Sequence, residues 1–77
     1  MDGDYAAAES EFKKALAIDP RIYHSWKGLA KVCLKTSRFS EAEEDCRKAI
    51  GLYSYDEEAR RMLEAIEQIR SEKGSVS

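Results

Sequence analysis

The sequence has few of the residues that interrupt a chain and few of the patterns that build sheets. Its 77 residues include one proline and four glycines, so few positions force a turn. Runs of β-branched residues and strict alternation of apolar and polar residues are both absent, which argues against β-strands. Because 43% of the residues are apolar and 36% are charged, the composition instead favours a soluble helical protein. A chain this short forms one small domain and buries only roughly 60% of its unfolded surface.

An excess of positive charge and a long apolar run are missing as well. The net charge is −2, which argues against nucleic acid or an anionic membrane as the main partner. The N-terminus has no basic and apolar signal segment, and no apolar run approaches membrane length. The two cysteines, Cys33 and Cys46, are fewer than a secreted domain of this size usually carries. We therefore expect a cytoplasmic protein that binds neither nucleic acid nor a membrane.

What the sequence does contain is an internal repeat. The stretch "GDYAAAESEFKKALAID" begins at Gly3, and "SRFSEAEEDCRKAIGLY" begins at Ser37. The two align without a gap, and the offset between aligned residues is the separation of Gly3 and Ser37 along the chain. We call this offset the repeat period. A fixed period of this size is typical of stacked supersecondary units. The identical pairs are Ala8/Ala42, Glu9/Glu43, Lys14/Lys48 and Ala15/Ala49.

The segments of the repeat predict an all-α fold with helices over residues 6–18, 22–36, 40–52 and 57–72. The second segment has apolar residues at the spacing of one helix face. Ser40 and Glu43 have the spacing of a capping box at the start of the third helix. Asp56 is expected to cap the start of the last helix and Gly74 its end. The apolar face of the second segment consists of Ile22, Trp26, Leu29, Ala30 and Cys33.

These residues resemble the tetratricopeptide repeat family, whose pattern is W-x2-L-G-x2-Y, then A-x3-F, then P, in a unit of about 34 residues. Trp26 and Leu29 match the first part, in which Ala30 and Cys33 stand for the Gly and the Tyr. The second part is matched by Ala8, Phe12 and Pro20 in the first copy and, with two replacements, by Ala42, Cys46 and Ser54 in the second.

The resemblance implies a fragment of an α-solenoid. Residues 6–18 would be the second helix of a first repeat, residues 22–54 a full repeat, and residues 57–72 a closing helix. We expect one domain over residues 1–73 and a flexible tail over residues 74–77. The family implies a non-catalytic protein–protein interaction module or scaffold, without a cofactor.

The cysteines are expected to be separate, reduced core thiols. In an antiparallel hairpin, facing residues have numbers with a constant sum, and Ala30 against Ala42 sets that sum. Cys33 and Cys46 are then about 10 Å out of register along the helices, too far for a disulfide. His24 lies on the opposite face of its helix from Cys33, so no nucleophile–base pair forms, and one His with two separated Cys is too few ligands for a metal. We predict neither a catalytic nor a metal-binding residue.

The polar face of the second helix is the candidate binding site. Residues 20–40 carry positive charge only. A solvated helix face is the plain alternative. In the family, the first helix of each pair lines the inner wall of a trough, which implies a groove for an acidic extended peptide or C-terminus. The residues expected to line it are His24, Lys27, Gly28, Lys31, Lys35 and Arg61.

Two details narrow the groove hypothesis. A glycine within a helix costs about 1 kcal/mol relative to alanine, so Gly28 is expected to make room for a ligand backbone. Some family members hold the acidic C-terminus of a chaperone with Lys and Asn on successive first helices. Here Lys31 follows Lys27 with no Asn, and Met62 lies on the next helix, so a co-chaperone role departs from that clamp.

The first helix lacks the helix that would precede it in a full repeat. Its face formed by Tyr5, Ala8 and Phe12 is expected to stay uncovered within one copy, with Phe12 substantially exposed. Such a face favours either a longer array or self-association. The alternative function is therefore a structural or oligomerisation fragment with no ligand in its groove.

Overall fold

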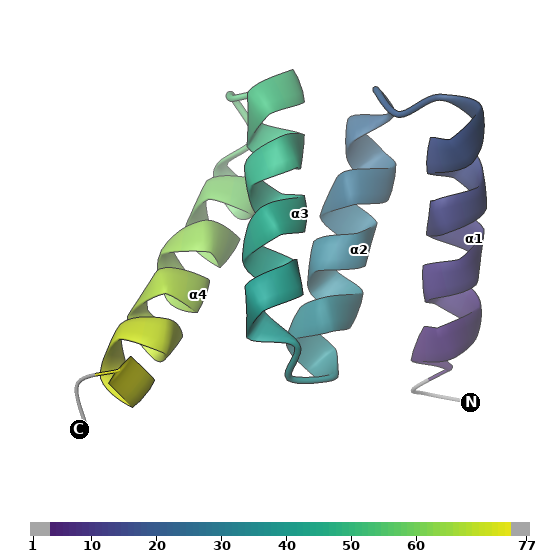
Figure 1. The fold of residues 1–77 in the computed structure, drawn as a ribbon. Coiled ribbons are helices and arrows are strands. Elements are labelled where there is room, and N and C mark those ends of the chain that lie inside the picture. Colours follow the sequence, from purple (N-terminus) through teal and green to yellow (C-terminus); the bar gives the residue numbers. More distant parts are fainter. Residues whose placement is uncertain (1–3, 75–77) are drawn as a thin grey trace.

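The protein is described here by a computed structural model that covers residues 4–74, with side chains through Glu72. Its helices are α1 (Tyr5–Ile18), α2 (Tyr23–Lys35), α3 (Phe39–Leu52) and α4 (Glu57–Gly74), as Figure 1 shows. The all-α prediction is confirmed, and each helix begins and ends within a few residues of its expected place. The sequence predicts a tail over residues 74–77. Gly74 is the last residue of α4, and residues 75–77 lie outside the described residues.

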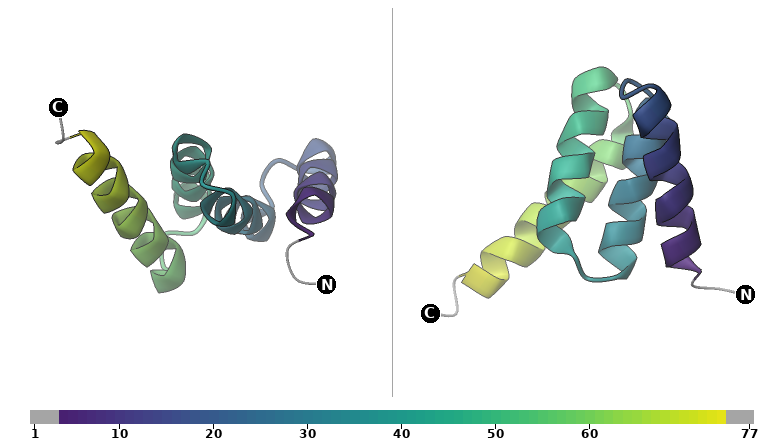
Figure 2. Two further views of the ribbon diagram at one scale, coloured as in Figure 1. Left: turned by 90° about the horizontal axis from the view of Figure 1, so that it is seen from below. Right: turned by 45° about the vertical axis from the view of Figure 1, so that its right-hand side comes forward.

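The helices form a row in which each one packs against the next. The main contacts join α1 to α2, α2 to α3, and α3 to α4. Seen from below, α1, α2 and α3 are nearly end-on and zigzag, while α4 is inclined to them (Figure 2). The shortest dimension of the molecule is 19 Å, which is roughly two helix diameters of about 10 Å. Such a row leaves side chains of α2 accessible on both sides of the layer.

The repeat period of the sequence is also the period of the packing. Most of the buried or half-buried residues of α4 lie one repeat period after residues of α2 that are covered as well. The same helix positions are therefore used twice for burial. The pairs are Ser25/Ala59, Gly28/Met62, Leu29/Leu63 and Val32/Ile66.

The other face of α4 breaks this equivalence. Towards α3, helix α2 presents Trp26, which lies under Lys48, and Cys33, which is bonded to Asp45. The residues one repeat period later on α4 are Arg60 and Glu67, both exposed. Thus α4 presents charge where α2 presents core, and these positions offer no apolar surface to a further helix.

Gly28 is small because an aromatic ring of the same chain covers it. A Cβ added to Gly28 would overlap the ring of Phe12, far inside van der Waals contact. The space expected for a ligand backbone is therefore filled by Phe12. Phe12 is correspondingly half-buried, so the expectation that it stays substantially exposed is wrong. It packs on the helix that follows α1, and Tyr5 and Ala8 are half-buried as well.

One repeat period later, the space between α3 and α4 is filled by side chains of different sizes. Cys46 takes the place of Phe12, and Met62 takes the place of Gly28. Cys46 is fully buried and its thiol donates to the carbonyl oxygen of Ala59 at 3.0 Å, while Met62 packs against the same core cluster. One large and one small residue thus share the space at each step. Cys33 and Cys46 are free thiols in this core, as expected, and burial raises the pKa of each to about 11.

The helix starts agree with the sequence at α4 and differ at α3. The Asp56 carboxylate accepts from the N–H groups of Glu58 at 2.9 Å and Ala59 at 3.3 Å, which confirms the cap. The capping box at Ser40 is wrong, because α3 already begins at Phe39 and no side chain caps it. The reason is the tight turn after α2, in which Ser37 takes a φ of 63° and ends the hairpin loop before Ser40.

Candidate functional site

The lysines of α2 meet carboxylates from the start of α4. Lys27 Nζ lies 2.7 Å from Asp56 Oδ2 and 2.7 Å from Glu58 Oε1, and Lys31 Nζ lies 2.9 Å from Glu58 Oε2. The Tyr23 hydroxyl also donates to Asp56, at 2.9 Å. The positive face read from residues 20–40 is therefore partly neutralised within the chain. The repeat in the sequence indicates this neutralisation. Glu58 lies one repeat period after His24, so it lies on the side of α4 that corresponds to the positive side of α2.

Lys27 is a structural residue of this cluster. Its side chain is 15% exposed, and that of Asp56 is 9% exposed. The hydrogen bonds to Asp56 and Glu58 hold the pKa of Lys27 above its usual value. The hydrogen bonds that Lys27 and Tyr23 donate lower the pKa of Asp56 to about 2. A ligand would have to break two ion pairs to reach Lys27.

The other expected groove residues are more accessible. His24 is exposed and its ring lies 4.4 Å from that of Tyr23. Lys31 is half-exposed, and Lys35 is exposed with no ion-pair partner among the described residues. Arg61 pairs with Glu57 at 3.6 Å and is 80% exposed; no described contact joins it to the lysines of α2. The structure thus brings Lys27 and Lys31 together and leaves His24, Lys31 and Lys35 open to a partner.

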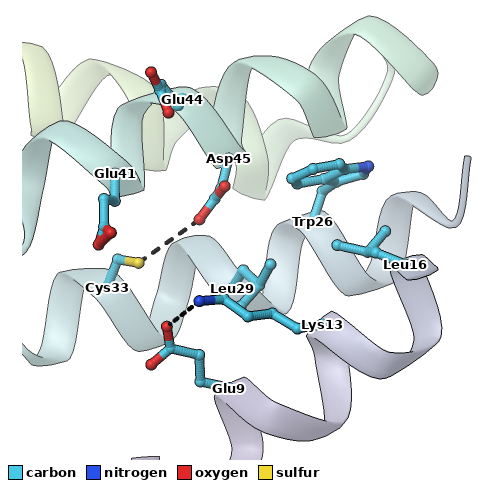
Figure 3. Close-up of a pocket in the computed structure, with 9 residues that line it drawn as sticks. All are labelled: Glu9, Lys13, Leu16, Trp26, Leu29, Cys33, Glu41, Glu44 and Asp45. Atoms are coloured by element: carbon cyan, nitrogen blue, oxygen red, sulfur yellow. Dashed lines mark hydrogen bonds and ion pairs between the residues drawn. The ribbon is translucent and has the colours of Figure 1, made fainter. Parts of the chain in front are cut away.

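A second concave site lies on the other side of α2, between α1 and α3. It is a cavity of about 260 Å³. Figure 3 shows α2 at its base, with residues of α1 and α3 forming opposite walls. No stretch of the sequence indicates this site, because its lining residues come from three separate helices. Its lining residues are Glu9, Lys13, Leu16, Trp26, Leu29, Cys33, Glu41, Glu44 and Asp45.

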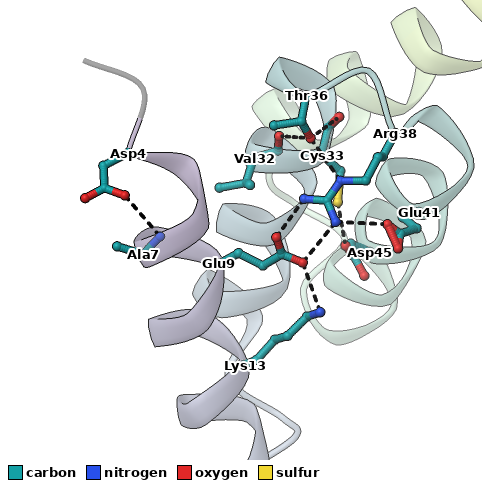
Figure 4. Close-up of polar contacts among 10 residues, drawn as sticks. All are labelled: Asp4, Ala7, Glu9, Lys13, Val32, Cys33, Thr36, Arg38, Glu41 and Asp45. Carbon is teal, nitrogen blue, oxygen red and sulfur yellow. Dashed lines mark hydrogen bonds and ion pairs between the residues drawn. The ribbon is translucent and has the colours of Figure 1, made fainter. Parts of the chain in front are cut away.

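Arg38 ties the wall of this cavity together. Its guanidinium donates two hydrogen bonds to the Glu9 carboxylate, at 2.7 and 3.0 Å, and one to Glu41 at 3.3 Å (Figure 4). Lys13 pairs with Glu9 at 2.9 Å. These bonds lower the pKa of Glu9 to about 2. The turn between α2 and α3 is thereby joined to α1, and both nearby cations are used.

Asp45 is the half-buried carboxyl group that α3 contributes to the wall. Its Oδ2 accepts from the Cys33 thiol at 3.6 Å. Burial raises the pKa of Asp45 to about 6, and the nearby charges of Glu41 and Glu44 push it in the same direction. Since the pKa of Cys33 is raised to about 11, its thiol stays protonated near neutral pH and is a poor nucleophile.

The described residues form neither a metal site nor a membrane-spanning helix. Within that part of the chain, no group of three or more His, Cys, Asp or Glu side chains is arranged to hold a metal ion. None of the described helices combines the length and the apolarity that crossing a membrane requires.

A row of antiparallel helices whose contacts recur with the repeat period of the sequence defines a helical-hairpin repeat protein. The family model described as tetratricopeptide repeat matches residues 1–49, which is more than half of the 77-residue chain. The chain belongs to the tetratricopeptide repeat family, as its motifs suggested, and proteins of this family generally bind other proteins. Comparisons with curated proteins and with solved structures gave no significant match.

Proposed function

We propose that the chain is a non-catalytic interaction module that binds an acidic extended segment or C-terminus on the exposed side of α2. Lys31 would hold a carboxylate, with His24 and Lys35 beside it. The family supports protein binding in general, and the accessible positive charges on α2 support an acidic partner. Lys27 would act as a support, because it fixes the start of α4 and is nearly covered.

The observation that carries this proposal is the contact between Lys31 and Glu58. Lys31 is half-exposed and already holds a carboxylate, with Nζ 2.9 Å from Glu58 Oε2. The Glu58 side chain is itself 54% exposed. An exposed ion pair contributes only about 0–1 kcal/mol, so a partner's carboxylate can replace Glu58 at small cost. Glu58 would therefore compete with the ligand.

Binding of a labelled tetraglutamate peptide, followed by fluorescence anisotropy, tests this site. Lys31→Ala should weaken binding about two- to fivefold, the range of one exposed ion pair. Glu58→Gln should tighten it, because the internal competitor is lost. Added salt should weaken binding to the unmodified chain. Lys14→Ala, an exposed lysine on α1, is the matched control and should change nothing. If Lys31→Ala and Glu58→Gln both bind like the unmodified chain, the proposal is wrong.

Self-association through α1 is the second candidate function. Ala8 and Ala15 of α1 are partly exposed, whereas Ala42 and Ala49, at the same positions of α3, are fully buried. Helix α1 thus lacks cover that α3 receives from its neighbours. Sedimentation velocity at rising concentration tests this, with Ala8→Glu expected to abolish any dimer; a monomer at every concentration would contradict it. The division into a domain over residues 1–73, the co-chaperone role and the cytoplasmic location remain predictions from the sequence.

A further inference from the structure

The cavity between α1 and α3 has an apolar base and the size of one side chain. Leu29 at its base is 4% exposed, and Leu16 and Trp26 flank it (Figure 3). Its volume of about 260 Å³ lies below the roughly 300–1,000 Å³ of pockets that take drug-sized ligands. The cavity therefore suits a single long side chain or a small amphipathic molecule.

The wall of this cavity has more negative charge than its own cations balance. Helix α3 contributes Glu41, Glu44 and Asp45. Of the nearby cations, Lys13 is paired with Glu9, and Arg38 is shared between Glu9 and Glu41. Asp45 has no cation within ion-pair distance among the described residues; its hydrogen bond comes from the Cys33 thiol. A half-buried carboxyl group thus faces the cavity with no cation paired to it in the described part of the chain.

We propose that this cavity binds the side chain of a lysine or arginine from a partner protein. The aliphatic stem would lie on Leu16, Trp26 and Leu29, and the cationic head would reach Asp45. Long basic side chains commonly cover apolar surface with their stems, and a charge-assisted hydrogen bond to a carboxylate is among the stronger polar contacts. This site is separate from the exposed side of α2 and takes the opposite charge.

Other occupants fit the cavity less well. An anion would meet the carboxyl groups of Glu41, Glu44 and Asp45 on α3 and that of Glu9 on α1. A purely apolar group would remove water from Asp45 without supplying a partner, which is unfavourable for a charged group. A metal ion lacks ligands, since no described cluster of metal-binding side chains is present there. Burial is the main cause of the raised pKa of Asp45, and the charges of Glu41 and Glu44 add to it.

The test is an NMR titration of the full chain with n-butylammonium, which reproduces a lysine stem and head. The Asp45 carboxyl carbon and the Leu16 and Leu29 methyl groups should shift together and saturate in the millimolar range. The pKa of Asp45 should fall from about 6 when the probe is bound. n-Butylguanidinium serves as the arginine arm. n-Butanol and butyrate, which lack the positive charge, should bind much more weakly.

Variants separate this site from general attraction to acidic surfaces. Asp45→Asn keeps the shape and should weaken n-butylammonium binding by about tenfold or more, the value of one hydrogen bond to a charged group. Glu44→Gln, an exposed change, should weaken it less and remains informative if Asp45→Asn fails to fold. Glu64→Gln on α4 is the matched control and should have no effect. The proposal is overturned if n-butanol binds as tightly as n-butylammonium, or if neither Asp45→Asn nor Glu44→Gln weakens binding. It is also overturned if no saturable shift occurs at Asp45, Leu16 and Leu29.

Discussion

The identity of a core residue in this chain depends on the size of the residue that it contacts. Phe12 agrees with the family pattern, while Cys46 departs from it at the same position of the next copy. The structure explains both, since Phe12 fills the space above Gly28 and Met62 fills the space beside Cys46. Neither the aromatic nor the thiol has a role that can be read from its own position. The size of the opposite residue decides which of them fits.

This pairing predicts strong coupling between positions 12 and 28. Gly28→Met should destabilise the protein by about 1–3 kcal/mol, because the new side chain overlaps the Phe12 ring. Phe12→Cys alone should also destabilise it, by leaving a gap. The double variant copies the Cys46 and Met62 arrangement and should cost clearly less than the sum of the two. Urea unfolding of all four proteins gives the coupling energy, and additive effects would show that the two contacts are not equivalent.

At the scale of helices, local signals predicted the elements and tertiary contacts decided the site. The apolar spacing along residues 22–36 and the Asp56 cap are local, and both held in the structure. The start of α3 was misplaced because the turn at Ser37 depends on backbone geometry that no residue type announces. The link from Lys27 to Asp56 joins residues far apart in the sequence, so charge counting along one segment could not find it. The acidic cavity needs three helices and was invisible for the same reason.

The Lys27–Asp56 contact makes the attachment of α4 sensitive to acid. The pKa of Asp56 is about 2 in the folded protein, below its ordinary value of 3.8. Its contribution to stability is therefore present above about pH 4 and is lost as the pH falls towards 2. Asp56→Asn keeps a capping oxygen but removes the charge. The stability difference between the unmodified chain and Asp56→Asn should be full at pH 6 and vanish as the pH falls through about 2.

Thermal unfolding of both proteins across that pH range measures this difference. Asp19→Asn is the control, since the contacts of the Asp19 carboxylate with the rest of the described chain are to the exposed Arg21, an ion pair at 3.9 Å and a hydrogen bond from its backbone N–H at 3.0 Å. A constant difference between the unmodified chain and Asp56→Asn at every pH would mean that the ion pair does not hold α4.

At the scale of the molecule, the surface charges disfavour one form of self-assembly. If a second copy placed its α1 on α4 as α3 lies on α2, the repeat period would bring Glu11 against Glu67 and Lys14 against Arg60. Within one copy, the equivalent positions hold two favourable contacts, one between Cys33 and Asp45 and one between Trp26 and Lys48. The stack would put a pair of like charges in the place of each. Like charges at both places repel. Any association of copies through α1 would therefore place it against something other than α4 in this register.

Reversing these charges should create the missing attraction. In the double variant Glu11→Lys with Lys14→Glu, both facing pairs become opposite in charge, so head-to-tail association should increase. Sedimentation velocity at low salt would detect it, and added salt should reverse it. The variant Glu11→Lys with Lys13→Glu keeps the same net charge but leaves Lys14 facing Arg60, and it should associate less. Equal association of the two variants would exclude this stacking.

Trp26, the one tryptophan in the sequence, gives the protein an intrinsic optical reporter. Its indole N–H donates to the Pro20 carbonyl at 2.8 Å, Lys48 lies 5.1 Å above its ring, and it borders the cavity between α1 and α3. Ultraviolet emission excited at the indole therefore comes from one place, where the α1–α2 turn, α3 and the cavity meet. A change in its colour or intensity signals an event at that junction, and an unlabelled chain is sufficient to observe it.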